Sequence, residues 1–257
     1  MSQMTREEFP VHFGRQAFGP RDTARAGDVW RAAQDAAVAA SAARGWPPSR
    51  YRTECCAFVI RGIRGFHDGE VRFGDVVTAR TWVSAFRREM FSSRRVDLFV
   101  EGRRVFSGVQ EWVHVAMPGM SIARASPELA ASFGVADGAA WMEPEWPELS
   151  PREPSDAMEF QAWHVVMDPL DHMNHPAYVD VADEVVARVL ASEGEAPSAW
   201  APVAEDVVWR SAIRGGDLVT GAVLASQRDG TTGWWRVELR VGERRVAEVR
   251  LARRRVG

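Results

Sequence analysis

The chain has 257 residues, of which 46% are hydrophobic and 26% charged, so it has the composition of a folded globular protein and the length for two small domains. Its formal net charge of −3 gives no electrostatic reason to expect a nucleic-acid partner. No apolar run is long enough to span a membrane.

The first half of the sequence predicts a strand, a long helix and further strands. A short strand over 11–18 leads into a helix over 27–44, and few polar residues occur between Ala32 and Ala43, as is typical of a helix buried on most sides. Turn signals such as Asp68-Gly69 and Glu101-Gly102 then separate β-rich stretches. The expected strands are 54–66, 76–86, 93–100 and 104–115.

The second half predicts the same order of elements after a proline-rich linker. Residues 141–154 hold prolines 144, 147, 151 and 154 among acidic residues, which forbids a helix or a central strand. A strand over 158–166 and a helix over 176–192 follow. The expected later strands are 204–213, 218–226, 234–241 and 245–252.

Three sequence matches indicate that the chain contains two copies of one unit. Residues 74–78 (GDVVT) recur as 216–220 (GDLVT), Arg103-Arg104-Val105 recurs as Arg244-Arg245-Val246, and the helical pattern from Trp30 recurs from Tyr178. We place the units at 1–140 and 155–257. One apolar helix followed by an antiparallel meander predicts an α+β hotdog, a sheet wrapped around its helix. Two such units would pair edge to edge as a tandem (double) hotdog with one continuous sheet.

The residues of both predicted units resemble the fatty acyl-ACP thioesterases of plants and bacteria. The similarity spans nearly the whole chain and includes Gly74-Asp75-Val76-Val77, Thr81-Trp82-Val83-Ser84 and Arg94-Arg95-Val96-Asp97. In the second unit, the run Asp168-Pro169-Leu170-Asp171-His172-Met173-Asn174 followed by Tyr178 is similar to the family's active-site loop. The resemblance implies hydrolysis of an acyl thioester of acyl carrier protein or coenzyme A.

The resemblance also implies which residues carry the chemistry. The family places an Asp-x-Asn-x-His arrangement in the second unit, with a downstream Glu or Cys. Asp168 and His172 match the acid and the histidine, but Leu170 stands at the asparagine position. The downstream group should fall near Ala212 and Ile213, where there is neither an acid nor a thiol.

The candidate catalytic residues are Asp168, His172 and Asn174. Asp168 is suited to act as a general base on water or as a nucleophile, and His172 to position the thioester carbonyl or share a proton. Asn174 is the only asparagine in the chain, which suggests a specific hydrogen bond. The alternatives are helix capping and turn formation for Asp168 and Asp171, and a hydrogen bond to the backbone for His172. For Asn174 the alternative is helix capping, and for His175 and Asp180 it is a surface or capping role.

Other functions remain open at this point. A hotdog enoyl-thioester hydratase or dehydratase would use an Asp and a His at a longer spacing, with an intervening asparagine. A non-catalytic acyl-thioester or carrier-binding protein would explain Leu170 and Ala212. The sequence contains no Gly-x-Ser-x-Gly elbow, H-E-x-x-H or phosphate-binding glycine loop, so we expect no metal and no cofactor.

Arginines and tryptophans indicate possible contact surfaces. The pairs Arg87-Arg88 and Arg94-Arg95 are expected on a solvated strand face, or alternatively at a docking site for an acidic carrier or a pantetheine phosphate. Most of the tryptophans at 82, 112, 209, 234 and 235 should belong to the sheet core, and some should line an acyl tunnel. The covalent pair of units allows a monomer or a further homodimer.

The cysteines and the first residues indicate the compartment. Cys55 and Cys56 are the only cysteines, and adjacent side chains of an extended chain point to opposite faces, which favours neither a disulfide nor a metal pair. Residues 1–10 carry charges and no apolar segment of the kind found in secretory signals. We therefore expect a cytoplasmic protein.

Overall fold

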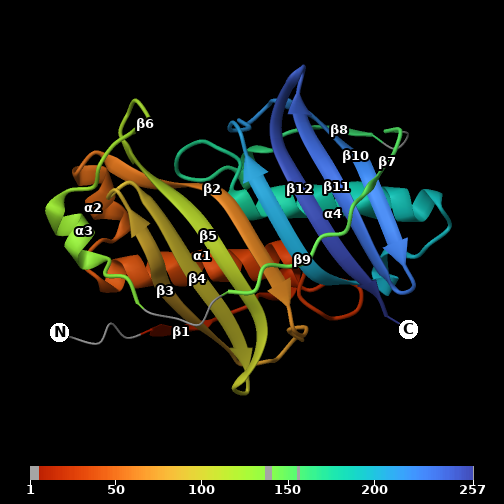
Figure 1. The fold of residues 1–257 in the computed structure, drawn as a ribbon, viewed down its shortest axis with the longest axis horizontal. Helices are drawn as coiled ribbons and strands as arrows, with labels where there is room; N and C mark the ends of the chain where they lie inside the picture. Colours follow the sequence, from red (N-terminus) through yellow and green to blue (C-terminus); the bar gives the residue numbers. More distant parts are fainter. Residues whose placement is uncertain (1–5, 137–140, 155–156, 257) are drawn as a thin grey trace.

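Two helices of 18 residues each organise the fold, α1 (Ala26–Ala43) and α4 (His175–Ser192). The computed structural model describes residues 6–136, 141–154 and 157–256. Residues 1–5 and 137–140 of the first predicted unit, and 155–156 and 257 of the second, lie outside the described residues. Figure 1 shows both helices behind the strands, so that they lie on one face of the sheet. No helix among the described residues is long and apolar enough to cross a membrane.

Both helices are buried along one apolar stripe and end in the same way. In α1 the fully buried side chains include Trp30, Ala33 and Ala40, at the three- and four-residue spacing of one helix face. Gly45 and Gly194 follow the two helices with φ near +80°, a conformation that favours glycine. The amide that follows each glycine donates to the carbonyl five residues back, which terminates both helices with a Schellman motif.

The strands form one antiparallel sheet whose first half comes from residues before 117. Its strands are β1 (Glu7–Val11), β2 (Cys56–His67), β3 (Val77–Arg87), β4 (Phe91–Val100) and β5 (Arg103–Ala116). The strands of the second half are β8 (Met158–Gln161), β9 (Trp200–Trp209), β10 (Leu218–Asp229), β11 (Thr232–Val241) and β12 (Arg244–Arg255). Two short strands, β6 (Ser121–Ile122) and β7 (Ser150–Pro151), pair with β5 and β10.

The strand order is the same in both halves, read outward from the middle of the sheet. From the middle outward, the order is β2-β5-β4-β3-β1 in the first half and β9-β12-β11-β10 in the second, where β8 and β7 pair with β10 at the far edge. The halves are joined where β2 pairs with β9, from Gly62 opposite Val208 to Phe66 opposite Ala204. The predicted continuous sheet is therefore observed, and its two inner edges are satisfied by each other.

Several predicted boundaries are wrong. The strand predicted over 11–18 lies earlier, at Glu7–Val11, and Arg15–Ala17 form a short 3-10 helix. The strand predicted over 158–166 ends at Gln161. The strand predicted over 204–213 is Trp200–Trp209, because the chain leaves the sheet at Arg210 and turns toward α4. Two short helices that begin with proline, α2 (Pro48–Thr53) and α3 (Pro127–Ser132), were not predicted.

A buried polar cluster joins the two halves behind the β2–β9 seam. The carboxylate of Glu205 on β9 is fully buried and lies 2.8 Å from Nε2 of His67 and 2.6 Å from Nη1 of Arg253. The indole N–H of Trp30 on α1 also donates to it, at 3.3 Å. Arg253 extends the cluster to Asp183 on α4, at 2.6 Å. Elements from both halves thus share one charge network.

Candidate active site

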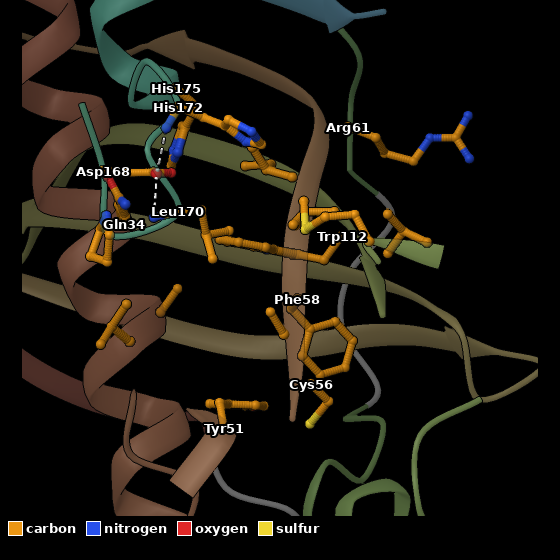
Figure 2. Close-up of a pocket in the computed structure, with 18 of the residues that line it drawn as sticks. Gln34, Tyr51, Cys56, Phe58, Arg61, Trp112, Asp168, Leu170, His172 and His175 are labelled. Atoms are coloured by element: carbon orange, nitrogen blue, oxygen red, sulfur yellow. Dashed lines mark hydrogen bonds between the residues drawn. The ribbon is translucent and has the colours of Figure 1, made fainter. Parts of the chain in front are cut away.

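The loop before α4 is a tight turn stabilised by its own backbone and by the carboxylate of Asp168. The Asp168 amide donates to the His172 carbonyl at 2.7 Å, and the Asp171 amide donates to the Asp168 carbonyl at 3.0 Å. Oδ1 of Asp168 accepts the amides of Leu170 and His172 at 2.8 and 3.2 Å (Figure 2). Asp171 adopts φ of +57°, so the turn formation considered for it is observed.

The same turn occurs before α1, without the functional side chains. There the Gly19 amide donates to the Thr23 carbonyl at 2.9 Å, and Asp22 has φ of +59°. Isolated bridges close both turns, Phe18 with Ala24 and Met167 with Met173. Gly19 and Thr23 thus occupy the places of Asp168 and His172. Of these two turns, only the second carries an acid and an imidazole.

A cavity of about 810 Å³ places Asp168 and His172 in one wall. It is lined by residues of both halves and reaches along α1 from Gln34 to Ser41. Its aromatic lining includes Trp46, Phe58, Phe86, Trp112, Phe133 and Trp209. Figure 2 shows Asp168, His172 and His175 at one end of the cavity and Tyr51 and Cys56 at the other. The cavity therefore combines an apolar channel with a polar end.

Asn174 is not part of the cavity wall with the other two candidates. It occupies the N-cap position of α4, yet its side chain makes no capping hydrogen bond. Its Oδ1 is buried and accepts no hydrogen bond from any described residue. The structure therefore brings Asp168 and His172 together at the cavity, and Asn174 is not among the residues that line it.

His175 is a cavity residue, so the surface or capping role expected for it is wrong. It begins α4, is buried, and its ring stands nearly perpendicular to those of Trp112 and Trp209, with centroids 6.2 and 5.9 Å away. Burial, with a smaller effect of Arg31, lowers the pKa of His175 to about 3. The imidazole is therefore neutral at pH 7, and its Nε2 has no hydrogen-bond partner among the described residues. The signal in the sequence was the apolar stripe of α4, which begins at this position and continues through Tyr178.

The positions where the resemblance implied further polar groups are apolar here. Leu170 and Ala212 both line the cavity. The segment around Ala212 is fixed against the turn, because the Met173 amide donates to the Ile213 carbonyl at 2.8 Å and the Ile213 amide donates to the Tyr178 hydroxyl at 3.2 Å. Next to Ala212, Ser211 places a buried hydroxyl without a hydrogen-bond partner among the described residues.

The expectation for the second arginine pair is also wrong. Arg87 and Arg88 are exposed, but Arg94 and Arg95 are buried, so they are neither a solvated face nor a docking surface. They lie on β4, which is covered on both faces. Arg94 contributes to the cavity wall, and Arg95 points to the opposite face, where its guanidinium lies 5.2 Å from the Trp82 ring.

Comparison with known proteins defines the fold. No family model and no curated protein matches the sequence. Comparison with solved structures shows that the chain has the same α+β hotdog fold as several thioesterases. A provisionally assigned oleoyl thioesterase from Lactobacillus plantarum superposes with a TM-score of 0.81 at 17% identity, over 97% of this chain and 94% of that one.

Two acyl-ACP thioesterases show the same similarity. The enzyme from Bacteroides thetaiotaomicron has a TM-score of 0.77 at 11% identity, over 98% of this chain and 100% of that one. The 12:0-ACP thioesterase from Umbellularia californica also has a TM-score of 0.77, at 13% identity, over 98% of this chain and 94% of that one. At such identities the likeness establishes the fold.

Proposed function

We propose that this protein hydrolyses an acyl thioester of coenzyme A or acyl carrier protein and releases a free carboxylic acid. The observation that carries the proposal is the position of Asp168 and His172 together at one end of a largely apolar cavity. An apolar channel suits an acyl chain, and a carboxylate beside an imidazole suits attack on its carbonyl. The shared fold of the named thioesterases supports the same reading.

The turn geometry suggests how Asp168 would act. Its Oδ1 is held by two backbone amides, while Oδ2 has no hydrogen bond to a described residue. We infer that Oδ2 takes a proton from water as the water oxygen attacks the thioester carbon. The carbon–sulfur bond then breaks, and the leaving thiolate receives that proton. The fixed Oδ1 keeps the free oxygen in a defined orientation.

His172 and the start of α4 would serve the developing oxyanion. The imidazole of His172 makes no hydrogen bond to a described residue, so it is free to donate to the carbonyl oxygen. The positive end of the α4 dipole lies at the same turn. His175, neutral at pH 7, is unsuited to supply a proton, and we assign it a shaping role beside Trp112 and Trp209.

Two exposed arginines support a phosphate-bearing substrate. The β2–β9 ladder ends at the pair Gly62 and Val208. Arg61 and Arg210 lie just beyond this end of the ladder, one on each chain segment. Both line the cavity, both are exposed, and neither makes an ion pair with a described residue. The phosphates of coenzyme A or of a carrier's phosphopantetheine would complement them. This pair replaces Arg94 and Arg95 in our docking hypothesis.

The repeated elements support the tandem arrangement that we propose for the chain. The strand order, the turn before each helix and the helix ends are alike in both halves. We keep the unit boundaries at 1–140 and 155–257, with the segment 141–154 as the connection. The cytoplasmic location and the oligomeric state stay predictions. Free thiols at Cys55 and Cys56 are compatible with that location.

A second candidate, a non-catalytic acyl-thioester binding protein, is favoured by one observation. Leu170 and Ala212 present apolar groups to the cavity at two positions where the resemblance implied polar ones. Such a protein would bind acyl thioesters without releasing thiol. The hydratase alternative has no comparable observation in its favour.

Replacing Asp168 by asparagine tests the proposed hydrolysis. Asparagine keeps an oxygen for the two amides of the turn, so the fold should persist while turnover falls about 100-fold or more. Asp171→Asn is the matched control, because this exposed residue has positive φ, which asparagine tolerates, and it should retain wild-type turnover. Release of free thiol from a panel of acyl thioesters, together with melting temperatures, measures both effects.

Equal turnover of the two variants would exclude Asp168 as the base. If the wild type binds acyl thioesters but releases no thiol from any of them, the binding-protein candidate is correct.

A further inference from the structure

One charged side chain in the cavity wall has no role in the proposed hydrolysis. Arg94 lies on β4, is 7% exposed and lines the cavity. The cavity is otherwise largely apolar, and burying a guanidinium there is costly unless an anion compensates it. Burial lowers the pKa of Arg94 to about 10, so the guanidinium still carries its charge at pH 7.

Arg94 has no carboxylate of its own among the described residues. Its one hydrogen bond there is from Nη1 to the Thr81 hydroxyl, at 3.3 Å, and its guanidinium lies 5.7 Å from the Phe133 ring. Glu7 is near enough to raise the pKa of Arg94, but Glu7 is held by Arg44 at 2.6 Å. The positive charge of Arg94 is therefore left without a partner in the cavity wall.

Arg94 belongs to the end of the cavity opposite Asp168. It interacts electrostatically with Tyr51, which Figure 2 shows at the far end from Asp168 and His172. The Tyr51 hydroxyl lies 3.0 Å from Oγ of Ser41, whose own proton is given to the Trp46 carbonyl, so Tyr51 is the donor of this pair. The lone pairs of Tyr51 remain available at this end.

A second buried polar group stands beside Arg94 without a partner. Gln110 on β5 is directly opposite Arg94 in the β4–β5 ladder, so the two side chains share one face of the sheet. Gln110 is fully buried, and neither its amide oxygen nor its amide nitrogen has a hydrogen bond to a described residue. Gln110 does not line the cavity, so it contributes to the buried polar surroundings of Arg94, and Arg94 is the polar group of this pair that a ligand would meet.

We propose that the acyl chain of the substrate ends in a carboxylate that binds Arg94, so that the substrate is the mono-thioester of a dicarboxylic acid. The inference rests on the proposed function for the thioester end. A carboxylate matches the guanidinium in charge and accepts two of its N–H groups, whereas a methyl terminus leaves the charge uncompensated.

The length of the cavity gives the approximate length of the chain. Gln34 and Ser41 both line the cavity and are two turns apart on α1, about 10 Å along the helix axis. An extended chain advances about 3.8 Å per three bonds, so about eight bonds separate the thioester carbonyl from the carboxylate.

The decisive comparison uses the wild-type protein and needs no variant. Coenzyme A mono-thioesters of dicarboxylic acids with six to fourteen carbons are compared with simple acyl-CoA of the same lengths. A charged hydrogen bond in a desolvated site predicts that the best dicarboxylic substrate exceeds its methyl-ended counterpart about 10- to 100-fold in kcat/KM. A preference for the methyl-ended chain at every length overturns the inference.

Two variants test whether Arg94 causes the preference for dicarboxylic substrates. Arg94→Met is expected to lose the preference and to improve hydrolysis of the simple acyl chains, whereas Arg94→Lys retains the charge and part of the preference. A purely structural arginine would instead lower both activities together, and its loss would leave the ratio unchanged. If neither variant folds, the wild-type profile alone decides.

Binding of the free acids separates this inference from the proposed hydrolysis. Calorimetry compares the dicarboxylic acids with fatty acids of equal length. If no thiol is released but the dicarboxylic acids bind more tightly, hydrolysis is wrong and the Arg94 inference stands. If thiol is released while fatty acids bind more tightly at every length, the hydrolysis stands and the inference is overturned.

Discussion

Replacing Glu205 by glutamine should destabilise the protein by about 3 kcal/mol at pH 7. Burial alone would raise the pKa of Glu205, but the charges and hydrogen bonds of His67 and Arg253 lower it from the ordinary 4.5 to about 2. That depression corresponds to about 3 kcal/mol of stability when the group is ionised in both states. An independent comparison agrees with this value, because removing one partner of a buried ion pair generally costs about 3–5 kcal/mol of stability.

The pH dependence has a defined sign. Because the folded-state pKa is depressed, the contribution is complete above the unfolded value near 4.5 and is lost as the pH falls toward 2. The difference between wild type and Glu205→Gln should therefore shrink to about 1 kcal/mol at pH 3. The variant lacks only the titration of Glu205 and keeps all the other carboxylates. The pH dependence of the difference in unfolding free energy therefore reports on Glu205 alone.

Urea unfolding at pH 7, 5 and 3 measures the difference, and the melting temperature should fall by about 6–12 °C at pH 7. Glu184→Gln is the control, since Glu184 forms an exposed i,i+4 pair with Arg188 and should change the free energy of unfolding by less than about 0.5 kcal/mol. A difference for Glu205→Gln below 1 kcal/mol at pH 7, or one that does not shrink below pH 5, would refute the reasoning.

Two further outcomes are expected. Gly65→Ala should lower the free energy of unfolding by about 1–3 kcal/mol, because the added Cβ would lie 2.7 Å from the Trp30 ring. The control Gly119→Ala should change it little, because no atom lies within 4 Å of the added Cβ. Equal melting temperatures of the two variants would contradict this. The double variant Arg61→Glu, Arg210→Glu should raise KM for acyl-CoA and leave kcat nearly unchanged. The rise in KM should diminish in high salt, because exposed charges are screened. An unchanged KM at low salt would show that these arginines do not bind the substrate.

The sequence predicted the arrangement of the long elements because they follow strong periodic patterns. The repeated GDVVT and GDLVT stretches lie at the starts of β3 and β10, and both 18-residue helices lie within a residue or two of their predicted ranges. The short helices α2 and α3 escaped prediction because six residues provide too few turns for a periodic signal.

The candidate site was predicted in part, for reasons that concern burial. Asp168 and His172 are predicted from the resemblance of their loop to a family's active-site loop, and a short loop keeps residues four positions apart close together. Arg94 and His175 were assigned to the surface, because charge and ring type indicate exposure on average. Their burial depends on packing against residues distant in sequence, such as Phe133 for Arg94 and Trp209 for His175, and that information is tertiary.

The turn before α1 and the position of Arg94 have a consequence for the tandem arrangement that we propose. Val77 pairs with Val100, and Val219 pairs with Val241, so counting back six residues along β4 and β11 equates Arg94 with Trp235. Trp235 is fully buried against Trp200, with ring centroids 5.6 Å apart, whereas Arg94 lines the cavity. Two identical chains would carry the same residue at both positions. A substitution that opens a cavity in one chain would then open it in the other as well. In one chain that holds two such units, a mutation can change a cavity-lining residue of one unit while the acid and histidine of the other unit stay unchanged.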